Sequence, residues 1–349
     1  ADRGGLLGVG QRALVGLHEP VLRDRIVALL APALSHPGAV LVDGTLGMGG
    51  HSEAVLSACP QARVIGIDRD LEALRLAGER LAAFGDRFRG VHATYDELPR
   101  VLSDLGLESV DAVLLDLGVS SLQLDRPGRG FAYRFDGPLD MRMDASAGHT
   151  AADLLNEASV AELTRILRDY GEEKFARKLA QEIVRQRDRQ PFETAAPLVE
   201  LIYRVIPAPA RRTGGHPAKR TFQALRMAVN DELGGIERVL PAALDAVAVG
   251  GRVVVEAYHS LEDRLVKRAF SQATRSRVPD GLPVVPEGME PIFVALTRGA
   301  EVADEAEVQH NARAASVRLR AVERRQPGRL APVPAPRPAR PTHSGGGIR

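Results

Sequence analysis

The sequence predicts an α/β fold, a doubly wound Rossmann-like sheet of seven strands into which an all-helical domain is inserted. Three observations lead to this prediction. From residue 39 onward, short apolar runs alternate with helical patterns, which is typical of a sheet covered on both faces. That rhythm stops over residues 125–231 and then resumes. The length of 349 residues allows about two domains of ordinary size.

Short runs rich in Val, Ile and Leu predict the strands, and helical patterns such as Leu71–Leu81 fill the gaps between them. Strands that alternate with helices favour a parallel sheet. The predicted strands are Ala39–Asp43, Arg63–Asp68, Phe88–Ala93, Asp111–Asp116, Gly251–Glu256, Pro291–Thr297 and Ser316–Ala321.

Within residues 125–231, apolar residues recur every three or four positions and no strand-like alternation is present. The predicted helices include Ala151–Leu155, Val160–Tyr170 and Glu173–Arg189. The sequence thus predicts a helical domain inserted between the fourth and fifth strands.

The remaining boundaries follow from this insertion. We expect a discontinuous sheet domain over residues 18–124 and 232–323. The glycine-rich residues 1–17 predict a flexible lead-in. Residues 324–349 hold six prolines, six arginines and no acid, so they predict a disordered basic tail.

Composition excludes several classes of protein. No run approaches the roughly 20 apolar residues of a membrane span, and no secretory segment is recognisable near residue 1. The single cysteine, Cys59, excludes an internal disulfide framework. The nine histidines form no cluster with ligand spacing, so no metal is predicted. A cytoplasmic protein is the expectation.

A glycine-rich turn, Asp43–Ser52, directly follows the first predicted strand. Glycines at such a turn let the backbone approach a ligand closely. Asp68, which ends the second strand, is placed to accept hydrogen bonds from ribose hydroxyls. The glycines do not match the G-x-G-x-x-G spacing of a dinucleotide site, and Asp43 would repel a pyrophosphate. The turn therefore favours a cationic ligand, S-adenosyl-L-methionine, over a nicotinamide dinucleotide.

The fourth strand ends at Asp116 and is followed by Gly118, Ser120 and Ser121. The carboxyl ends of central strands border the ligand crevice in doubly wound sheets, which suits Asp116 for contact with cofactor and substrate. Ser and Asp also favour helix N-caps, so a capping role is the alternative. His51 likewise either contacts the cofactor or is an ordinary first-turn helix residue.

Taken together, these segments resemble the bacterial ribosomal RNA small subunit methyltransferase H family, over roughly His18 to Arg325. The segments that carry the resemblance are His18–Leu22, Asp43–Ser52, Asp116–Asp125, Gly137–Asp144, Tyr170–Ala176, His216–Arg226 and His259–Lys267.

The resemblance implies methylation of N4 of a cytidine in the decoding region of 16S rRNA, with S-adenosyl-L-methionine as the donor. It implies a class I methyltransferase sheet, an inserted substrate-recognition domain, and the rRNA or small ribosomal subunit as partner. A homo-oligomer is possible. The implied cofactor contacts are Gly49, Gly50, His51, Asp68, Tyr95, Asp116 and Gln123. One departure is Glu256-Ala257-Tyr258, where a small polar residue and phenylalanine are expected, so the role of Tyr258 is left open.

The catalytic residues that we predict are Asp116, Ser120 and His259. The Asp116–Ser121 turn would supply acceptors for the amino protons of cytosine, because the chain lacks the Asp/Asn-Pro-Pro-aromatic signature of many amino methyltransferases. His259 would either accept the released proton or only cap the helix that starts at Ser260.

A basic run between residues 201 and 230 contains six cations and no carboxylate. Such a run indicates contact with phosphates, although a solvated surface is the plain alternative. Aromatic residues make up only 4% of the chain, so we expect recognition through shape and phosphates. The predicted RNA contacts are Lys219, Arg220, Arg226 and Arg129. The competing functions are a nicotinamide-dependent dehydrogenase and a non-catalytic RNA-binding or assembly factor.

Overall fold

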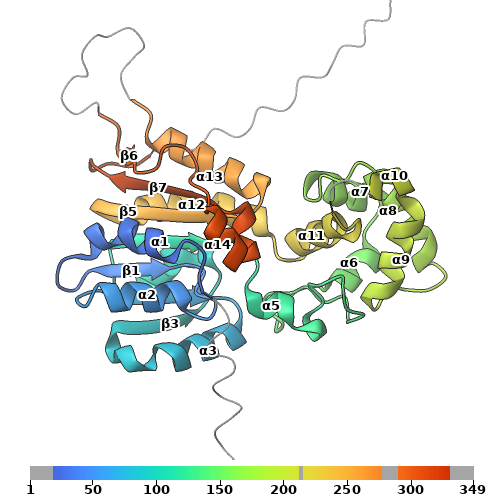
Figure 1. The fold of residues 1–349 in the computed structure, drawn as a ribbon, viewed down its shortest axis with the longest axis horizontal. Helices are drawn as coiled ribbons and strands as arrows, with labels where there is room; N and C mark the ends of the chain where they lie inside the picture. The colour runs from blue at the N-terminus through green and yellow to red at the C-terminus, as the bar shows by residue number, and fades with distance from the viewer. Residues whose placement is uncertain (1–18, 212–214, 277–289, 331–349) are drawn as a thin grey trace, which may run out of the picture.

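The computed structural model describes residues 19–211, 215–276 and 290–330. The predicted lead-in and most of the predicted tail lie outside the described residues. The fold is built on one seven-stranded sheet, with helices on both of its faces and a helical lobe beside it (Figure 1). The order of the strands is β3-β2-β1-β4-β5-β7-β6.

Each predicted strand is present, with small differences at the ends. The strands are β1 (Val40–Asp43), β2 (Arg63–Asp68), β3 (Phe88–His92), β4 (Val110–Asp116), β5 (Val247–Ala257), β6 (Phe293–Ala295) and β7 (Arg318–Arg324). The predicted parallel pairing is present from β3 to β5, and the prediction is wrong only for β7, which runs antiparallel to both β5 and β6. An apolar run marks a strand but carries no signal for its direction.

Two hydrophobic clusters cover the two faces of the sheet. Successive residues of β4 show this alternation, since Val113 and Leu115 enter one cluster and Ala112 and Leu114 enter the other. The first cluster is completed by α4 (Leu98–Asp104), α12 (Glu232–Ala246) and α13 (Ser260–Ala273). The second is completed by α1 (Arg23–Leu30), α2 (Gly50–Ala58) and α3 (Leu71–Leu81).

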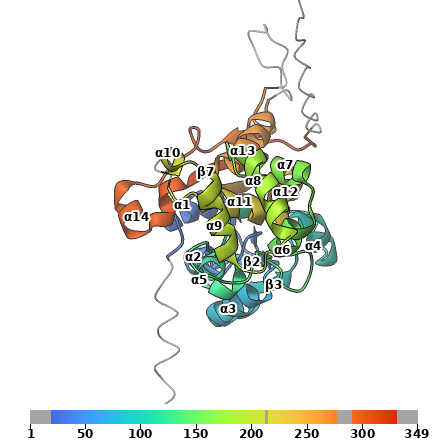
Figure 2. The ribbon, with the colours of Figure 1, turned by 90° about the vertical axis from the view of Figure 1, so that its right-hand side faces the viewer.

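The helical lobe has a third hydrophobic cluster of its own, drawn from residues 131–225. Figure 2 looks onto this lobe from the side that lies to the right in Figure 1. We propose that residues 125–231 form an inserted domain, because their apolar side chains pack mainly against one another. Its helices are α6 (Ala151–Glu157), α7 (Val160–Asp169), α8 (Ala176–Arg187), α9 (Ala195–Val205), α10 (Ala208–Arg211) and α11 (Ala218–Val229).

The last described strand runs further than the sequence predicts. Arg324, assigned to the start of the tail, ends β7 and is buried, and its guanidinium donates to the carbonyl oxygens of Leu244 and Val247. Two short helices complete the structure, α5 (Ser121–Asp125) and α14 (Glu305–His310). Among the described residues, no helix is long and apolar enough to span a membrane.

Candidate active site

A cavity of about 860 Å³ lies where the sheet edge meets the helical lobe. Both parts of the molecule line it, from Gly44 after β1 and Asp116 at the end of β4 to Phe222 on α11. The structure thereby brings together residues that are far apart in the sequence. The predicted site residues that line the cavity are Gly50, His51, Asp68, Tyr95, Asp116, Ser120, Gln123, Lys219, Arg226 and His259.

The turn after β1 requires glycine at two of the predicted positions. Gly49 has a φ of +78°, which an L side chain rarely adopts, and a Cβ on Gly50 would lie 2.6 Å from Pro20 Cγ. Asp43 is buried and is absent from the cavity lining. Its carboxylate instead accepts hydrogen bonds from Ser52 Oγ at 2.7 Å and Thr45 N at 3.2 Å. Asp43 therefore holds the turn together, and its predicted contact with a cationic ligand is wrong.

Asp68 lies at the end of β2 and faces the cavity. Its two carboxylate oxygens accept hydrogen bonds from Gly47 N and Asp70 N, each at 2.8 Å. Burial raises the pKa of Asp68 to about 6, against the opposing effect of these hydrogen bonds. The carboxylate is thus fixed in direction while each oxygen retains capacity for a ligand hydroxyl.

Three titratable groups from different elements converge beside this turn. His51 Nε2, on the first turn of α2, lies 3.3 Å from Glu256 Oε2 and 3.6 Å from Asp116 Oδ2. Asp116 and Glu256 are register partners on the parallel strands β4 and β5. His51 and Glu256 are buried, and the two carboxylates hold the pKa of His51 well above its ordinary value against the effect of burial.

The donor atoms of His51, Asp116 and Glu256 lie within 4.8 Å of one another, a spacing that a metal ion could use. We assign this cluster to the predicted methyl donor, because His51 and Asp116 both line the cavity into which the glycine turn opens.

Ser120 and Gln123 form a capping box at the start of α5. Ser120 Oγ accepts a hydrogen bond from Gln123 N at 3.3 Å, and Gln123 Oε1 accepts one from Ser120 N at 3.2 Å. The capping alternative for Ser120 is therefore present in the structure. Both residues also line the cavity, so their position permits the predicted contacts of Ser120 with the substrate and of Gln123 with the cofactor.

Tyr95 follows β3 and lines the cavity wall next to α12. Its hydroxyl donates a hydrogen bond to Glu232 O at 3.2 Å, and burial raises its pKa, so the phenol stays neutral. Tyr258 also lines the cavity. Burial, with Asp116 and Glu256 nearby, holds the pKa of Tyr258 well above its usual range.

His259 is the N-cap of α13. Its Nδ1 accepts a hydrogen bond from Leu261 N at 3.2 Å, and Nε2 lies 2.8 Å from Gln223 Nε2 on α11. Burial lowers the pKa of His259. The capping role proposed as the alternative is therefore present, and the ring additionally joins the helical lobe to the sheet domain.

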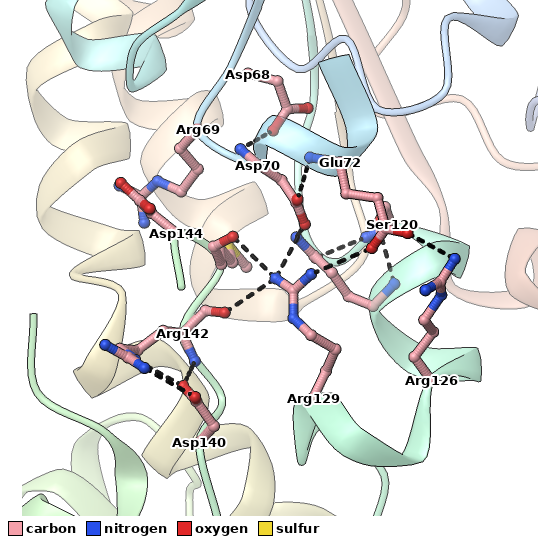
Figure 3. A network of polar contacts seen from close by, with 12 residues as sticks. Asp68, Arg69, Asp70, Glu72, Ser120, Arg126, Arg129, Asp140, Arg142 and Asp144 are labelled. Atoms are coloured by element: carbon pink, nitrogen blue, oxygen red, sulfur yellow. Dashed lines mark hydrogen bonds and ion pairs between the residues drawn. The ribbon is translucent and has the colours of Figure 1, made fainter. Parts of the chain in front are cut away.

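Arg129 does not offer a free cation to RNA. Figure 3 shows its side chain directed toward Asp70, with Glu72 and Arg126 nearby. Its Nη2 lies 3.0 Å from Asp70 Oδ2 and donates to Met143 O at 3.0 Å. The RNA contact of Arg129 stays a prediction, although the structure already pairs its charge with Asp70.

Arg226 is also an internal residue. Its guanidinium donates to Glu232 Oε1 at 2.8 Å and to Oε2 at 2.9 Å, and only 16% of its side chain is exposed. The RNA contact of Arg226 stays a prediction, and it would be made by a guanidinium that already pairs with Glu232. Lys219 and Arg220, by contrast, are exposed, and neither forms an ion pair within the described part of the chain.

Comparison with known proteins identifies the family. A sequence profile of the MraW methylase family matches residues 16–325. This chain belongs to that family. The family resemblance predicted from the sequence is therefore confirmed.

Two relatives show how far this similarity extends. The ribosomal RNA small subunit methyltransferase H of a Nocardioides species is 67% identical over 90% of this chain and 98% of its own length. The protein of the same name from Frankia alni is 62% identical over 89% of this chain and 96% of its own. Among solved structures, an rRNA methylase from Streptococcus thermophilus is 12% identical, with a TM-score of 0.39, over 87% of this chain and 94% of that one. The fold of this chain is assigned from its own strand order and not from this comparison.

Two buried acids of the site were not predicted from the sequence. Glu256 ends the apolar part of β5, and Glu262 accepts hydrogen bonds from Tyr258 N and His259 N. Burial raises the pKa of Glu262 to about 7. The signal for Glu256 was available, because the same pattern, an acid that closes an apolar strand, had singled out Asp68 and Asp116.

Proposed function

We propose that this protein transfers a methyl group from S-adenosyl-L-methionine to N4 of a cytidine in the decoding region of 16S rRNA. The observation that carries the proposal is the cavity that the sheet edge and the helical lobe line together. One side offers carboxylates and a glycine turn suited to the donor, and the other offers the cationic Lys219. The names of the relatives, which specify the RNA of the small ribosomal subunit, support this substrate and hence a cytoplasmic reaction.

The residues at the sheet edge fit the donor. Asp68 binds the ribose hydroxyls. Gly49 gives the turn its left-handed conformation, and Gly50 leaves the turn without a side chain that would meet Pro20 in the cavity wall. Asp116 and His51 lie beside the amino-acid end, while Tyr95 and Gln123 border the adenine. When bound, S-adenosyl-L-methionine supplies a methyl group on a positively charged sulfur.

The nitrogen of an exocyclic amino group is a weak nucleophile, since its lone pair is delocalised into the cytosine ring. Acceptors of the turn after β4, Ser120 Oγ among them, hold the amino protons and favour a tetrahedral nitrogen. Placing nitrogen, methyl and sulfur in line is worth about 7–11 kcal/mol of the barrier. With the donor bound, the nitrogen–carbon bond would form as the sulfur–carbon bond breaks, which leaves a neutral thioether, and the nitrogen would release its extra proton to solvent water.

We assign His259 to capping rather than to proton transfer. A neutral imidazole accepts a hydrogen bond at only one nitrogen, and Nδ1 already accepts from Leu261 N. We expect His259→Ala to lower the free energy of unfolding by about 1 kcal/mol, as loss of an N-cap does. Single-turnover methylation should be unchanged. A large loss of rate with normal donor binding would instead show that His259 takes part in the reaction.

The test is methylation by the purified full-length chain. Small subunits and naked 16S rRNA from cells that lack this activity would be incubated with labelled donor, and the nucleosides separated by mass spectrometry. The proposal predicts N4-methylcytidine in the decoding-region fragment. Label on another nucleoside, or none on either substrate, would contradict it. Tight binding of a nicotinamide dinucleotide in calorimetry would instead favour the dehydrogenase.

A further inference from the structure

Glu256 is a buried carboxylate to which neither the sequence nor the proposed reaction gives a role. Its side chain is fully buried at the end of β5, directly across from Asp116 on β4. Neither Oε1 nor Oε2 has a hydrogen-bond partner of good geometry among the described residues. A buried carboxylate in this state is costly unless a cation or a proton compensates it.

His51 is the group placed to compensate this charge. Its Nε2 lies 3.3 Å from Glu256 Oε2, closer than it lies to Asp116. The ring is on the first turn of α2, where the helix dipole disfavours a cation. The negative charges of Asp116 and Glu256 offset that effect. The two carboxylates together therefore stabilise the protonated ring more than Asp116 alone would.

Resting on the proposed function, we propose that Glu256 is a positioning residue of the methyl-donor site, which holds His51 as a cation beside Asp116. The ring then neutralises part of the acidic cluster and keeps the Asp116 carboxylate directed at the cavity. Of the three cluster residues, Asp116 and His51 line the cavity. Glu256 itself does not line the cavity and acts through these two side chains.

The charged groups around the cluster come from several elements. Besides Asp116, they are Asp43 on β1, Tyr258 after β5, Glu307 on α14 and Arg313 in the segment that follows α14. Most of these groups are acidic or neutral. They therefore favour the protonated ring, in the same direction as Glu256.

The experiment compares the wild type with Glu256→Gln, which keeps the size of the side chain and removes its charge. The ring nitrogens of His51 would be followed by NMR with labelled histidine, and His51→Gln would identify its signals among the nine histidines. The proposal predicts a protonated ring at pH 8 in the wild type and a largely neutral ring in Glu256→Gln. The dissociation constant for S-adenosylhomocysteine should rise about tenfold, because a neutral His51 no longer offers a charged partner to the amino-acid end of the ligand.

The matched control is Glu323→Gln, a buried glutamate on β7 that pairs with Arg252. It should leave the His51 signals and ligand binding unchanged. Identical His51 signals in wild type and Glu256→Gln would overturn the proposal, as would unchanged affinity. Micromolar Zn²⁺ binding that Glu256→Gln abolishes would also overturn it, because the cluster would then be a cation site. The NMR result does not depend on methylation, so failure of the proposed function would be recognised separately.

Discussion

The two sides of the cavity differ in how their charged side chains are placed. At the sheet edge, Glu256 and His51 are buried and Asp68 is half-buried, and each lies beside groups that fix its direction. On the helical lobe, Lys219 and Arg220 are exposed. A small, rigid ligand is best bound by fixed groups, whereas a polyanion of variable shape is bound by cations that can adjust. The difference matches a methyl donor on one side and RNA on the other.

The same comparison separates arginines that look alike in the sequence. Arg226 lies in the same basic run as Lys219 and Arg220, yet it faces inward from α11 and pairs with Glu232 on α12. Arg220 lies six residues earlier and on another face of α11, because a helix turns by about 100° per residue, whereas Lys219 shares the face of Arg226 but lies about two turns nearer the start of the helix. Variants of the inward-facing and the exposed residues should therefore differ in their effects on stability, donor binding and RNA binding.

Removal of the inward-facing arginine should have the largest effect. Arg226→Met leaves the buried Glu232 carboxylate without its partner, and breaking a buried ion pair in this way costs about 3–5 kcal/mol. Thermal unfolding should show a clearly lower Tm. The control, Arg220→Met one helix face away, should unfold like the wild type. Equal stability of the two variants would remove the distinction between internal and exposed cations.

Asp116→Asn should reduce kcat/KM for methylation by about a hundredfold, because a carboxylate that contacts a cationic donor is lost. Donor affinity measured by calorimetry should fall as well. The matched control is Asp111→Asn at the opposite end of β4, where the carboxylate accepts from Val40 N. Activity that survives Asp116→Asn would place the donor elsewhere.

Donor binding should weaken at acidic pH. Burial raises the pKa of Asp68 to about 6, and in the proposed function its ionised form would accept the two ribose hydroxyls. As the pH falls through about 6, the carboxyl becomes protonated, so affinity should drop by up to about tenfold per pH unit. Calorimetry between pH 5 and 8, with Asp68→Asn as the comparison, would check this. A flat profile in the wild type would argue against a role for Asp68.

The double variant Lys219→Ala/Arg220→Ala should have the smallest effect on the protein and act only on RNA. Loss of two phosphate contacts should lower the salt slope of RNA binding by about 1.5, while the Tm and donor affinity stay constant. The measurement is a filter-binding series over salt concentration. If donor affinity fell in parallel with RNA binding, these two cations would belong to the structure of the site.

The sequence analysis located the sheet edge well because strand ends and glycines constrain where neighbouring residues lie. Gly49 needs its left-handed conformation, and Asp68 and Asp116 close apolar strands, so their place at one edge follows from topology. The direction of β7 could not be predicted, because an apolar run does not indicate which way its strand runs. Nor could composition show that Arg129 reaches Asp70, since the two residues meet only through the tertiary fold.

Glu256 illustrates the remaining difficulty. Its position at the end of a strand was visible, but its partner His51 lies more than two hundred residues away in the chain. Only the parallel pairing of β4 with β5, together with the placement of α2, brings the two groups within 3.3 Å. Pairings of this kind depend on the register of a sheet that forms from distant segments.

The most direct test of the central claim is a crystal structure of the full chain with S-adenosylhomocysteine. The account predicts the ribose hydroxyls on Asp68, the adenine beside Tyr95 and Gln123, and the amino-acid end next to Asp116 and His51. A ligand bound elsewhere while the glycine turn stays empty would contradict the assignment of this cavity to methyl transfer.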